Sequence, residues 1–112
     1  MSHFEFITGI PLTEMPLDLR DSLAMKLDVL RNGERLRGWQ KVGNQFHIEE
    51  DVLYYLEDEL LKPAGSPTLE LIKILETKGE NVLELVNALK SPEVNYPDVG
   101  LLIQRRMEAV SD

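Results

Sequence analysis

Apolar residues recur at steps of three and four in six separate stretches of this chain of 112 residues. Proline and glycine lie between most of these stretches, and both residues interrupt helices, so each stretch predicts a short helix of its own. No stretch alternates between apolar and polar residues as a half-buried strand does. Short helices with one apolar face bury that face by packing together. We therefore predict an all-α fold, a compact antiparallel bundle of six helices.

The same periodicity predicts where each helix lies. The expected ranges are 17–30, a short helix from Trp39 to about Gly43-Asn44, 49–61, 67–78, a fifth helix from Val82 that closes at Ser91-Pro92, and 97–109. Residues three and four apart share one face of a helix, and the apolar ones are expected to point inward. These are Leu19, Leu23, Leu27, Leu30, Trp39, Val42, Phe46, Ile48, Val52, Leu56, Leu60, Leu71, Ile72, Leu75, Val82, Leu85, Val86, Leu89, Val99, Leu102 and Ile103.

Local signals mark the ends of the later helices most clearly. Ser66-Pro67 predicts a helix start, since serine can cap free backbone N–H groups and proline is tolerated at the first helical position. Lys78-Gly79 predicts the end of the same helix. Asn81 followed by Glu84 is typical of a capping box. The fourth and fifth helices are therefore the best defined by sequence.

Length and composition indicate one domain. A chain of this size with 43% apolar residues can bury a single core. Residues 1–15 contain Gly9 and Pro11, which favour an extended arm packing on the bundle. We expect residues 16–109 to form the domain and residues 110–112 a short tail.

Charge and residue usage favour a protein partner. The net charge of −8 and pI near 4.7 disfavour nucleic acid and anionic membranes as partners. No apolar run reaches the length of a membrane span, and the N-terminus lacks a signal-peptide pattern. The absence of cysteine excludes disulfides and cysteine zinc sites and fits a reducing compartment, so we expect a cytoplasmic location.

The charges are segregated along the chain. Arginines cluster in the predicted loop 31–38, whereas acids dominate the predicted helix 49–61, so we expect a bipolar molecule. We predict two partner-binding surfaces, one basic and one acidic. The basic residues are Arg31, Arg35, Arg37 and Lys41, and the acidic residues are Glu49, Glu50, Asp51, Glu57, Asp58 and Glu59. The alternative interpretation is an ordinary solubilising surface.

One group of residues has the spacing of a catalytic or metal site. His47, Glu50 and Asp51 lie three and four apart and could hold a metal or form an acid–base pair. The alternative is a solvated histidine and acids at a helix start, where acids favour the dipole. Residues Glu57 and Glu59 are two apart and do not face each other on a helix. We predict no catalytic residue, no metal and no cofactor.

Trp39 also has two interpretations. Tryptophan is enriched among the residues that dominate binding at protein interfaces, so an exposed Trp39 could anchor a partner. Its helical spacing with Val42 instead favours packing in the core. We expect Trp39 to point inward.

The predicted order of helices and two local motifs resemble the death-domain superfamily over about residues 16–107. Gly38-Trp39-Gln40-Lys41-Val42 is similar to the family's tryptophan at the start of the second helix, three residues before an aliphatic residue. Ser66-Pro67-Thr68-Leu69-Glu70-Leu71-Ile72 is similar to the Ser/Asn-Pro-Thr start of the fourth helix in the kinases of interleukin-1 and Toll signalling.

Within that superfamily the chain looks most like the N-terminal death domain of the paracaspase. The run that carries this likeness is Gly65-Ser66-Pro67 through Leu71-Ile72-Lys73-Ile74 to Lys78-Gly79, then Glu84-Leu85 and Leu89. Two positions depart from the superfamily pattern. Leu75 stands where many members carry a second tryptophan, and Gly43 stands where the second helix usually has alanine.

The resemblance implies a non-catalytic module that binds other death domains, of its own or another kind, and builds higher-order oligomers in cytoplasmic innate-immune, NF-κB-like signalling. It also implies a longer protein with a protease or kinase domain elsewhere. One alternative is an intramolecular regulatory or scaffold domain of a larger enzyme that never self-assembles. Another is a small helical enzyme that uses His47.

Overall fold

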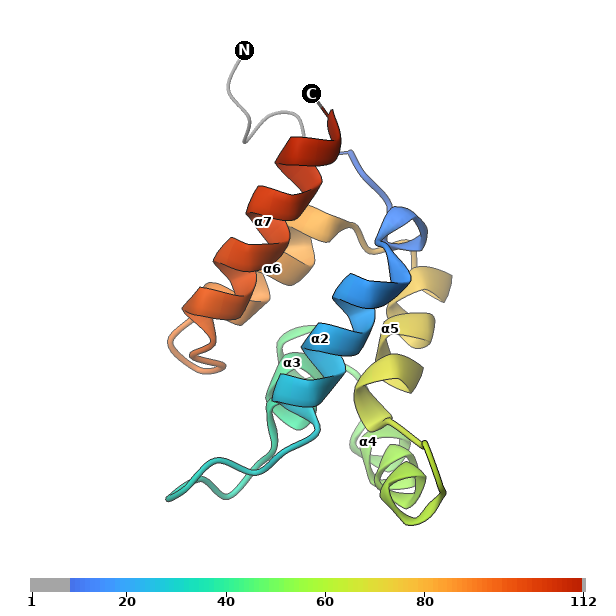
Figure 1. Cartoon of the computed structure of the whole chain (residues 1–112). Helices are drawn as coiled ribbons and strands as arrows, with labels where there is room; N and C mark the ends of the chain where they lie inside the picture. Colours follow the sequence, from blue (N-terminus) through green and yellow to red (C-terminus); the bar gives the residue numbers. More distant parts are fainter. Residues whose placement is uncertain (1–8, 112) are drawn as a thin grey trace.

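The computed structural model describes the backbone of residues 9–111 and the side chains of residues 9–109. The described chain consists of six α-helices and two short 3₁₀-helices (Figure 1), and its one extended pairing is an isolated bridge between Pro11 and Asn81. The all-α prediction is therefore confirmed. In chain order the elements are η1 (Leu12–Glu14), α2 (Leu17–Leu27), α3 (Gly38–Gln45), α4 (Glu50–Leu56), η2 (Glu57–Leu61), α5 (Pro67–Thr77), α6 (Val82–Lys90) and α7 (Pro97–Ser111).

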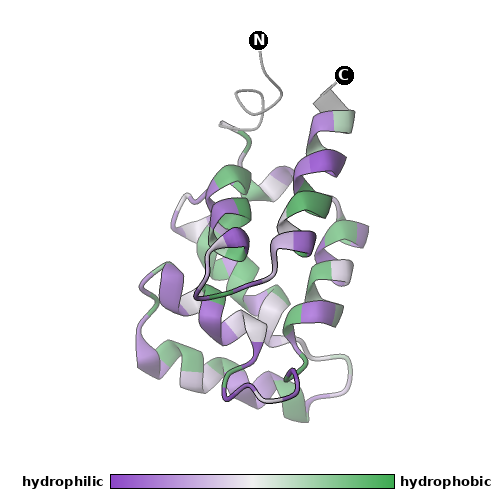
Figure 2. Cartoon of the chain, turned by 90° about the vertical axis from the view of Figure 1, so that its left-hand side faces the viewer, coloured by the Kyte–Doolittle hydropathy of each residue, from purple (hydrophilic) through white to green (hydrophobic). Residues whose placement is uncertain are grey.

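Helix α5 is the central element of the bundle. It contacts α2, α3, α4, η1 and η2, while α6 and α7 run antiparallel side by side (Figure 1). Figure 2 shows both hydrophobic and hydrophilic residues on the helices, as expected where one face of each covers a common core. The buried residues form one core. Helix α2 packs on α5, and the α6–α7 pair is joined to the rest of the bundle through the contact of α6 with α3.

The core contains most of the residues that the periodicity placed there. Trp39 is fully buried at the start of α3, which confirms the inward prediction and excludes an exposed anchor. Its indole N–H has no hydrogen-bond partner among the described residues. The largest fully buried side chains are Trp39, Leu12, Leu19, Leu23, Leu27, Leu71, Ile72, Leu75, Leu85, Leu89 and Ile103.

Helix α5 begins and ends where its local signals predicted. Ser66 Oγ accepts a hydrogen bond from the Leu69 N–H at 3.2 Å, and Pro67 is the first helical residue. Gly79 follows the helix with a φ of +81°, the left-handed conformation that favours glycine. Asn81 likewise caps α6 by accepting from the Glu84 N–H at 2.9 Å. These helix ends are local events, which explains why sequence patterns located them.

The prediction for the first helix was wrong at its C-terminal end. Helix α2 ends at Leu27 rather than at residue 30, and Leu30 is 43% exposed. The reason is a contact distant in sequence: the side chain of Asp28, the next residue, binds the start of α5. The chain therefore leaves the helix before Leu30 reaches the core.

Two further boundaries differ from the predictions. The predicted helix 49–61 divides into α4 and the 3₁₀-helix η2, because the chain tightens after Leu56 as it turns toward α5.

Helix α3 continues past Gly43-Asn44 to Gln45, and His47 adopts the left-handed conformation there, with a φ of +56°. A Cβ at Gly43 would lie 2.5 Å from Leu53 Cδ2, so glycine at this position allows close packing of α3 on α4 rather than a helix end.

Part of the predicted N-terminal arm lies against the bundle. Residues 1–8 and 112 lie outside the described residues. Residues 12–14 are not extended but form η1, where Leu12 is fully buried, and Met15 beside it is also buried. The Val82 N–H donates to the Ile10 carbonyl at 2.9 Å. The segment from Ile10 to Met15 therefore closes one end of the core.

Candidate protein interaction surfaces

Arg31, a predicted contact residue, is bonded within the chain. Its guanidinium lies 3.8 Å from the centroid of the Tyr96 ring. It donates to the carbonyls of Asn95 at 3.0 Å and Val94 at 3.4 Å, and to Glu34 Oε1 at 3.1 Å. Arg31 thereby holds the connection between α2 and α3 against the turn that precedes α7. It is a structural residue of this fold.

Lys41, a second predicted contact residue, is also paired internally. Its ammonium lies 2.8 Å from Glu34 Oε2, and only 12% of the Lys41 side chain is exposed. The hydrogen bond from Lys41, together with the charges of Lys41 and Arg31, lowers the pKa of Glu34 from its ordinary value. Glu34 therefore binds two of the four predicted basic residues.

Arg35 and Arg37 remain available for a partner. Neither side chain forms an ion pair among the described residues, and Arg35 is exposed. The Arg37 N–H donates to Gln40 Oε1 at 2.8 Å, which fixes the start of α3. Leu36 lies between the two arginines with 40% of its surface exposed. We call Arg35, Leu36 and Arg37 the basic surface.

The acidic residues of α4 and η2 are mostly unpaired. Glu59 alone has a cation, Lys62 at 2.9 Å, and this contact raises the pKa of Lys62. Within the described part of the chain the others form no ion pair, and all of them are exposed: Glu49, Glu50, Asp51, Glu57 and Asp58. We call these five residues, together with Tyr54 and Tyr55, the acidic surface.

Two tyrosines were missed by sequence reasoning. Tyr54 is 77% exposed and Tyr55 is 71% exposed on α4. Both fall off the apolar stripe that runs through Val52 and Leu56, and this offset was the signal that could have identified them. An exposed aromatic ring among carboxylates offers a partner apolar area as well as charge.

The basic and acidic surfaces adjoin instead of lying at opposite poles. A hollow of about 240 Å³ is lined by Leu36 of the basic surface and by Glu50, Tyr54 and Glu57 of the acidic surface. Gln40, Asn44 and Leu53 complete its lining. Glu50 and Tyr54 are spaced i, i+4 and share the side of α4 that faces this hollow, and Glu57, the first residue of η2, lies next to them. The expected bipolar molecule is therefore one in which the two signs meet at one end of the bundle.

The structure does not bring His47 together with Glu50 and Asp51. His47 lines a different hollow, of about 370 Å³, with Glu80 and Glu84 among its neighbours, whereas Glu50 lines the hollow beside Leu36. Among the described residues no group of three or more histidines and carboxylates is arranged to hold a metal ion. The geometry thus separates the residues of that alternative site.

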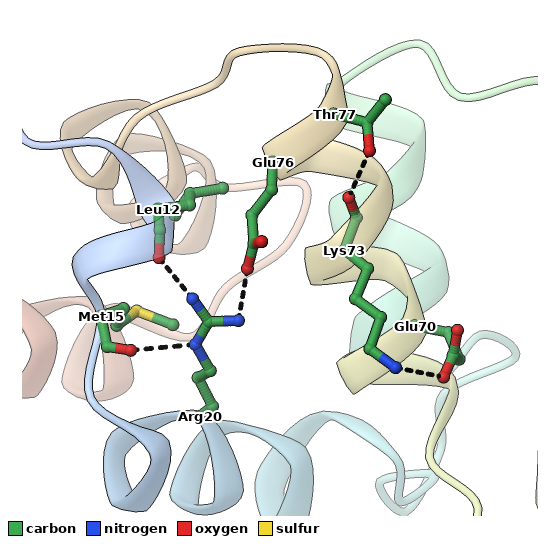
Figure 3. Close-up of polar contacts among 7 residues, drawn as sticks. All are labelled: Leu12, Met15, Arg20, Glu70, Lys73, Glu76 and Thr77. Atoms are coloured by element: carbon green, nitrogen blue, oxygen red, sulfur yellow. Dashed lines mark hydrogen bonds and ion pairs between the residues drawn. The ribbon is translucent and has the colours of Figure 1, made fainter.

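Two charged residues position these elements without having been singled out by sequence. Arg20 on α2 donates to the carbonyls of Met15 at 2.9 Å and Leu12 at 2.6 Å, and pairs with Glu76 of α5 (Figure 3). It joins η1, α2 and α5. Glu76 lies 56 residues away in sequence, so this pairing leaves no local pattern.

Asp28 is the second such residue. Its carboxylate accepts from Ser66 Oγ at 2.6 Å, from Thr68 Oγ1 at 2.6 Å and from the Thr68 N–H at 3.0 Å. The Thr68 side chain is buried, so these bonds satisfy polar groups that water does not reach. Asp28 thereby fixes the point at which the connection to the basic surface leaves α2.

None of the helices in the described part of the chain is long and apolar enough to cross a membrane. No protein-family model, curated protein or solved structure matches this chain. The features of this chain that bear on function are the adjoining basic and acidic surfaces and the motifs that resemble the death-domain superfamily.

Proposed function

We propose that this chain is a non-catalytic interaction module of the death-domain type that binds other death domains in a cytoplasmic signalling assembly. The observation that carries the proposal is the pair of oppositely charged surfaces whose charges have no partner inside the described chain. Arg35 and Arg37 of one copy would contact the carboxylates of α4 and η2 on the next.

The positions that carry the family resemblance fit their expected places in the fold. Trp39 is buried at the start of α3, and Ser66-Pro67 begins α5. The two departures from the family pattern have physical explanations. Leu75 is fully buried in the central helix, and Gly43 allows Leu53 to approach α3 closely. These observations support the assignment to the superfamily.

Ion pairs alone contribute too little free energy for stable binding. Each exposed ion pair contributes about 0.2 to 1 kcal/mol, and this contribution weakens in salt. Leu36 on one surface and Tyr54 on the other supply the apolar contact that binding needs in addition. Because the two surfaces differ, the contact is heterologous and can propagate from copy to copy into a ring or a helix. Such an assembly would concentrate any protease or kinase domain attached to the module.

Light scattering coupled to size-exclusion chromatography tests this proposal. The chain is compared at about 50 and about 500 mM salt, over a range of concentrations, with the variant Arg35→Glu Arg37→Glu. We expect oligomers that dissociate in high salt and are absent in the variant. Arg105→Glu is the control for a single charge reversal, because Arg105 is an exposed arginine on α7 and belongs to neither surface.

A monomer under every condition would contradict self-assembly. Mixing the chain with a death domain of another kind would then separate heterotypic binding from the alternative of an intramolecular regulatory domain. In that alternative the isolated module binds neither itself nor another death domain.

A further inference from the structure

A separate groove with apolar and charged lining residues lies between α2 and α7. It consists of two adjoining hollows of about 300 and about 330 Å³. Lys26 of α2 and Asp98 of α7 line both hollows, so the two hollows lie next to each other. The remaining lining residues are Leu19, Ser22, Leu23, Val99, Leu102 and Ile103 in the first hollow, and Met25, Val29, Arg31 and Tyr96 in the second. We call this feature the α2–α7 groove.

The groove is open because its two walls pack on different neighbours. Helix α7 packs mainly on α6, and α2 packs mainly on α5. Leu102 was predicted to face the core, yet it is 48% exposed at the edge of the groove. Met25 and Val29 are exposed along the other wall, at 76% and 57%. Exposed apolar side chains that lie together are a common feature of protein interaction sites.

The charges along the groove are arranged in a defined register. At one end Arg106 of α7 donates to Asp18 of α2 at 2.9 Å. Lys26 lies eight residues after Asp18 on α2, and Asp98 lies eight residues before Arg106 on α7, so this second pair corresponds to the first with the signs exchanged. Both are exposed, and neither forms an ion pair or a side-chain hydrogen bond among the described residues. The groove thus carries one unpaired cation and one unpaired anion, one on each wall.

We propose that the α2–α7 groove binds a second copy of this chain in a closed, twofold contact. In a twofold contact the same patch meets itself, so a patch of a single sign repels itself. A patch with one cation and one anion is self-complementary. Lys26 of each copy faces Asp98 of the other, and the apolar side chains of Met25, Val29 and Leu102 are buried between them.

This contact is independent of the proposed function. It uses neither Arg35 nor Arg37, and it closes at two copies, whereas the contact between the basic and acidic surfaces can propagate. In combination, the twofold contact would link two assemblies that are each built through the basic and acidic surfaces.

Sedimentation velocity tests the twofold contact in the Arg35→Glu Arg37→Glu background, where association through the basic surface is removed. We expect a concentration-dependent dimer in this background. In Lys26→Glu the new glutamate faces Asp98 of the other copy twice, and in Asp98→Lys the new lysine faces Lys26 twice. Each variant alone should therefore weaken dimerisation at least about tenfold, because like charges brought together at an interface repel each other.

An equimolar mixture of the two variants is the decisive measurement. The introduced glutamate of one variant then faces the introduced lysine of the other, and the unchanged Asp98 of the first faces the unchanged Lys26 of the second. Both oppositely charged pairs are thereby restored. We expect a heterodimer with an affinity within about threefold of the unmodified groove. Circular dichroism of each variant checks that the exposed substitutions leave the fold intact.

Three outcomes would overturn the proposal. They are a monomer in the Arg35→Glu Arg37→Glu background up to about 1 mM, single variants that dimerise like the parent, and a mixture that remains monomeric. The last outcome would assign Lys26 and Asp98 to a contact within one copy. None of these results bears on assembly through the basic and acidic surfaces, which the salt-dependent experiment above tests separately.

Discussion

The connection from Asp28 to Arg37 and the segment from Glu49 to Glu59 are both rich in charge, but they use it in opposite ways. In the connection, Asp28, Arg31 and Glu34 all form bonds within the chain. In the α4–η2 segment only Glu59 has a cation, and the remaining acids are exposed without one in the described structure. The first region uses Asp28, Arg31 and Glu34 to hold a loop in place and leaves Arg35 and Arg37 without an ion pair among the described residues, whereas the second presents nearly all of its charges to solvent.

This difference shows that a charge run in sequence does not identify an interface. The predicted basic surface contained four residues, and two of them have an internal partner in Glu34. A loop needs such bonds because it has few backbone hydrogen bonds of its own, whereas a helix satisfies its backbone and leaves its outer side chains free. Substitutions of the bonded residues of the connection should therefore affect stability, whereas substitutions of the unpaired residues of both regions should affect association.

Asp28→Ala should have the largest effect on stability. It removes three hydrogen bonds and leaves the buried Thr68 hydroxyl and N–H without an acceptor, so we expect the free energy of unfolding to fall by about 2 to 4 kcal/mol. Urea denaturation measures this loss. Asp28→Asn keeps one carbonyl oxygen as an acceptor and should lose less. A change within about 0.5 kcal/mol in the alanine variant would show that the connection is not held by this carboxylate.

Arg31→Ala and Arg35→Ala form a matched pair in the same loop. The first removes the contact with the Tyr96 ring and the bonds to two carbonyls, and should cost about 1 kcal/mol. The second removes an exposed arginine without an ion pair and should change stability by less than about 0.5 kcal/mol. Thermal unfolding of both variants measures the difference, and equal losses would remove the distinction between the two arginines.

Glu34 should make the connection sensitive to acid. Its pKa in the folded chain is lowered from the ordinary 4.5 by the hydrogen bond from Lys41 and the charges of Lys41 and Arg31. A carboxylate with a lowered pKa stabilises the fold above its unfolded pKa, and this contribution is lost as the pH falls through the folded pKa. The parent chain should thus have a higher thermal unfolding midpoint than Glu34→Gln near pH 7, and this difference in midpoint should shrink below about pH 4.5. A difference that is constant with pH would contradict this role.

Glu50→Lys Glu57→Lys should have the smallest effect on stability, below about 0.5 kcal/mol, because neither acid has a partner in the described chain. It should nevertheless abolish the salt-dependent oligomer. Mixing it with Arg35→Glu Arg37→Glu should restore association of the two variants, as measured by light scattering. Glu93→Lys, on the exposed turn before α7, is the control, and an equal loss of oligomer in that control would point to net charge alone.

The sequence by itself determined the number of helices, the class of fold and most of the core. The caps at Ser66 and Asn81 and the stripe from Val82 to Leu89 depend on neighbours within one or two turns, so a local pattern was sufficient to predict them. The prediction was wrong where a residue depends on a distant partner. Leu30 is exposed because Asp28 ends α2, and Leu102 is exposed because α7 packs on α6 and leaves the α2–α7 groove open.

The tertiary structure alone decided which charges are free. Arg20 meets Glu76 across 56 residues, and Asp28 meets Thr68 across 40. Arg31 reaches the Asn95 carbonyl across 64 residues. An arginine bonded in this way and an exposed arginine four positions later look alike in sequence. The physical reason is that the pairing of side chains depends on which helices lie side by side, and that arrangement follows from the packing of the whole core.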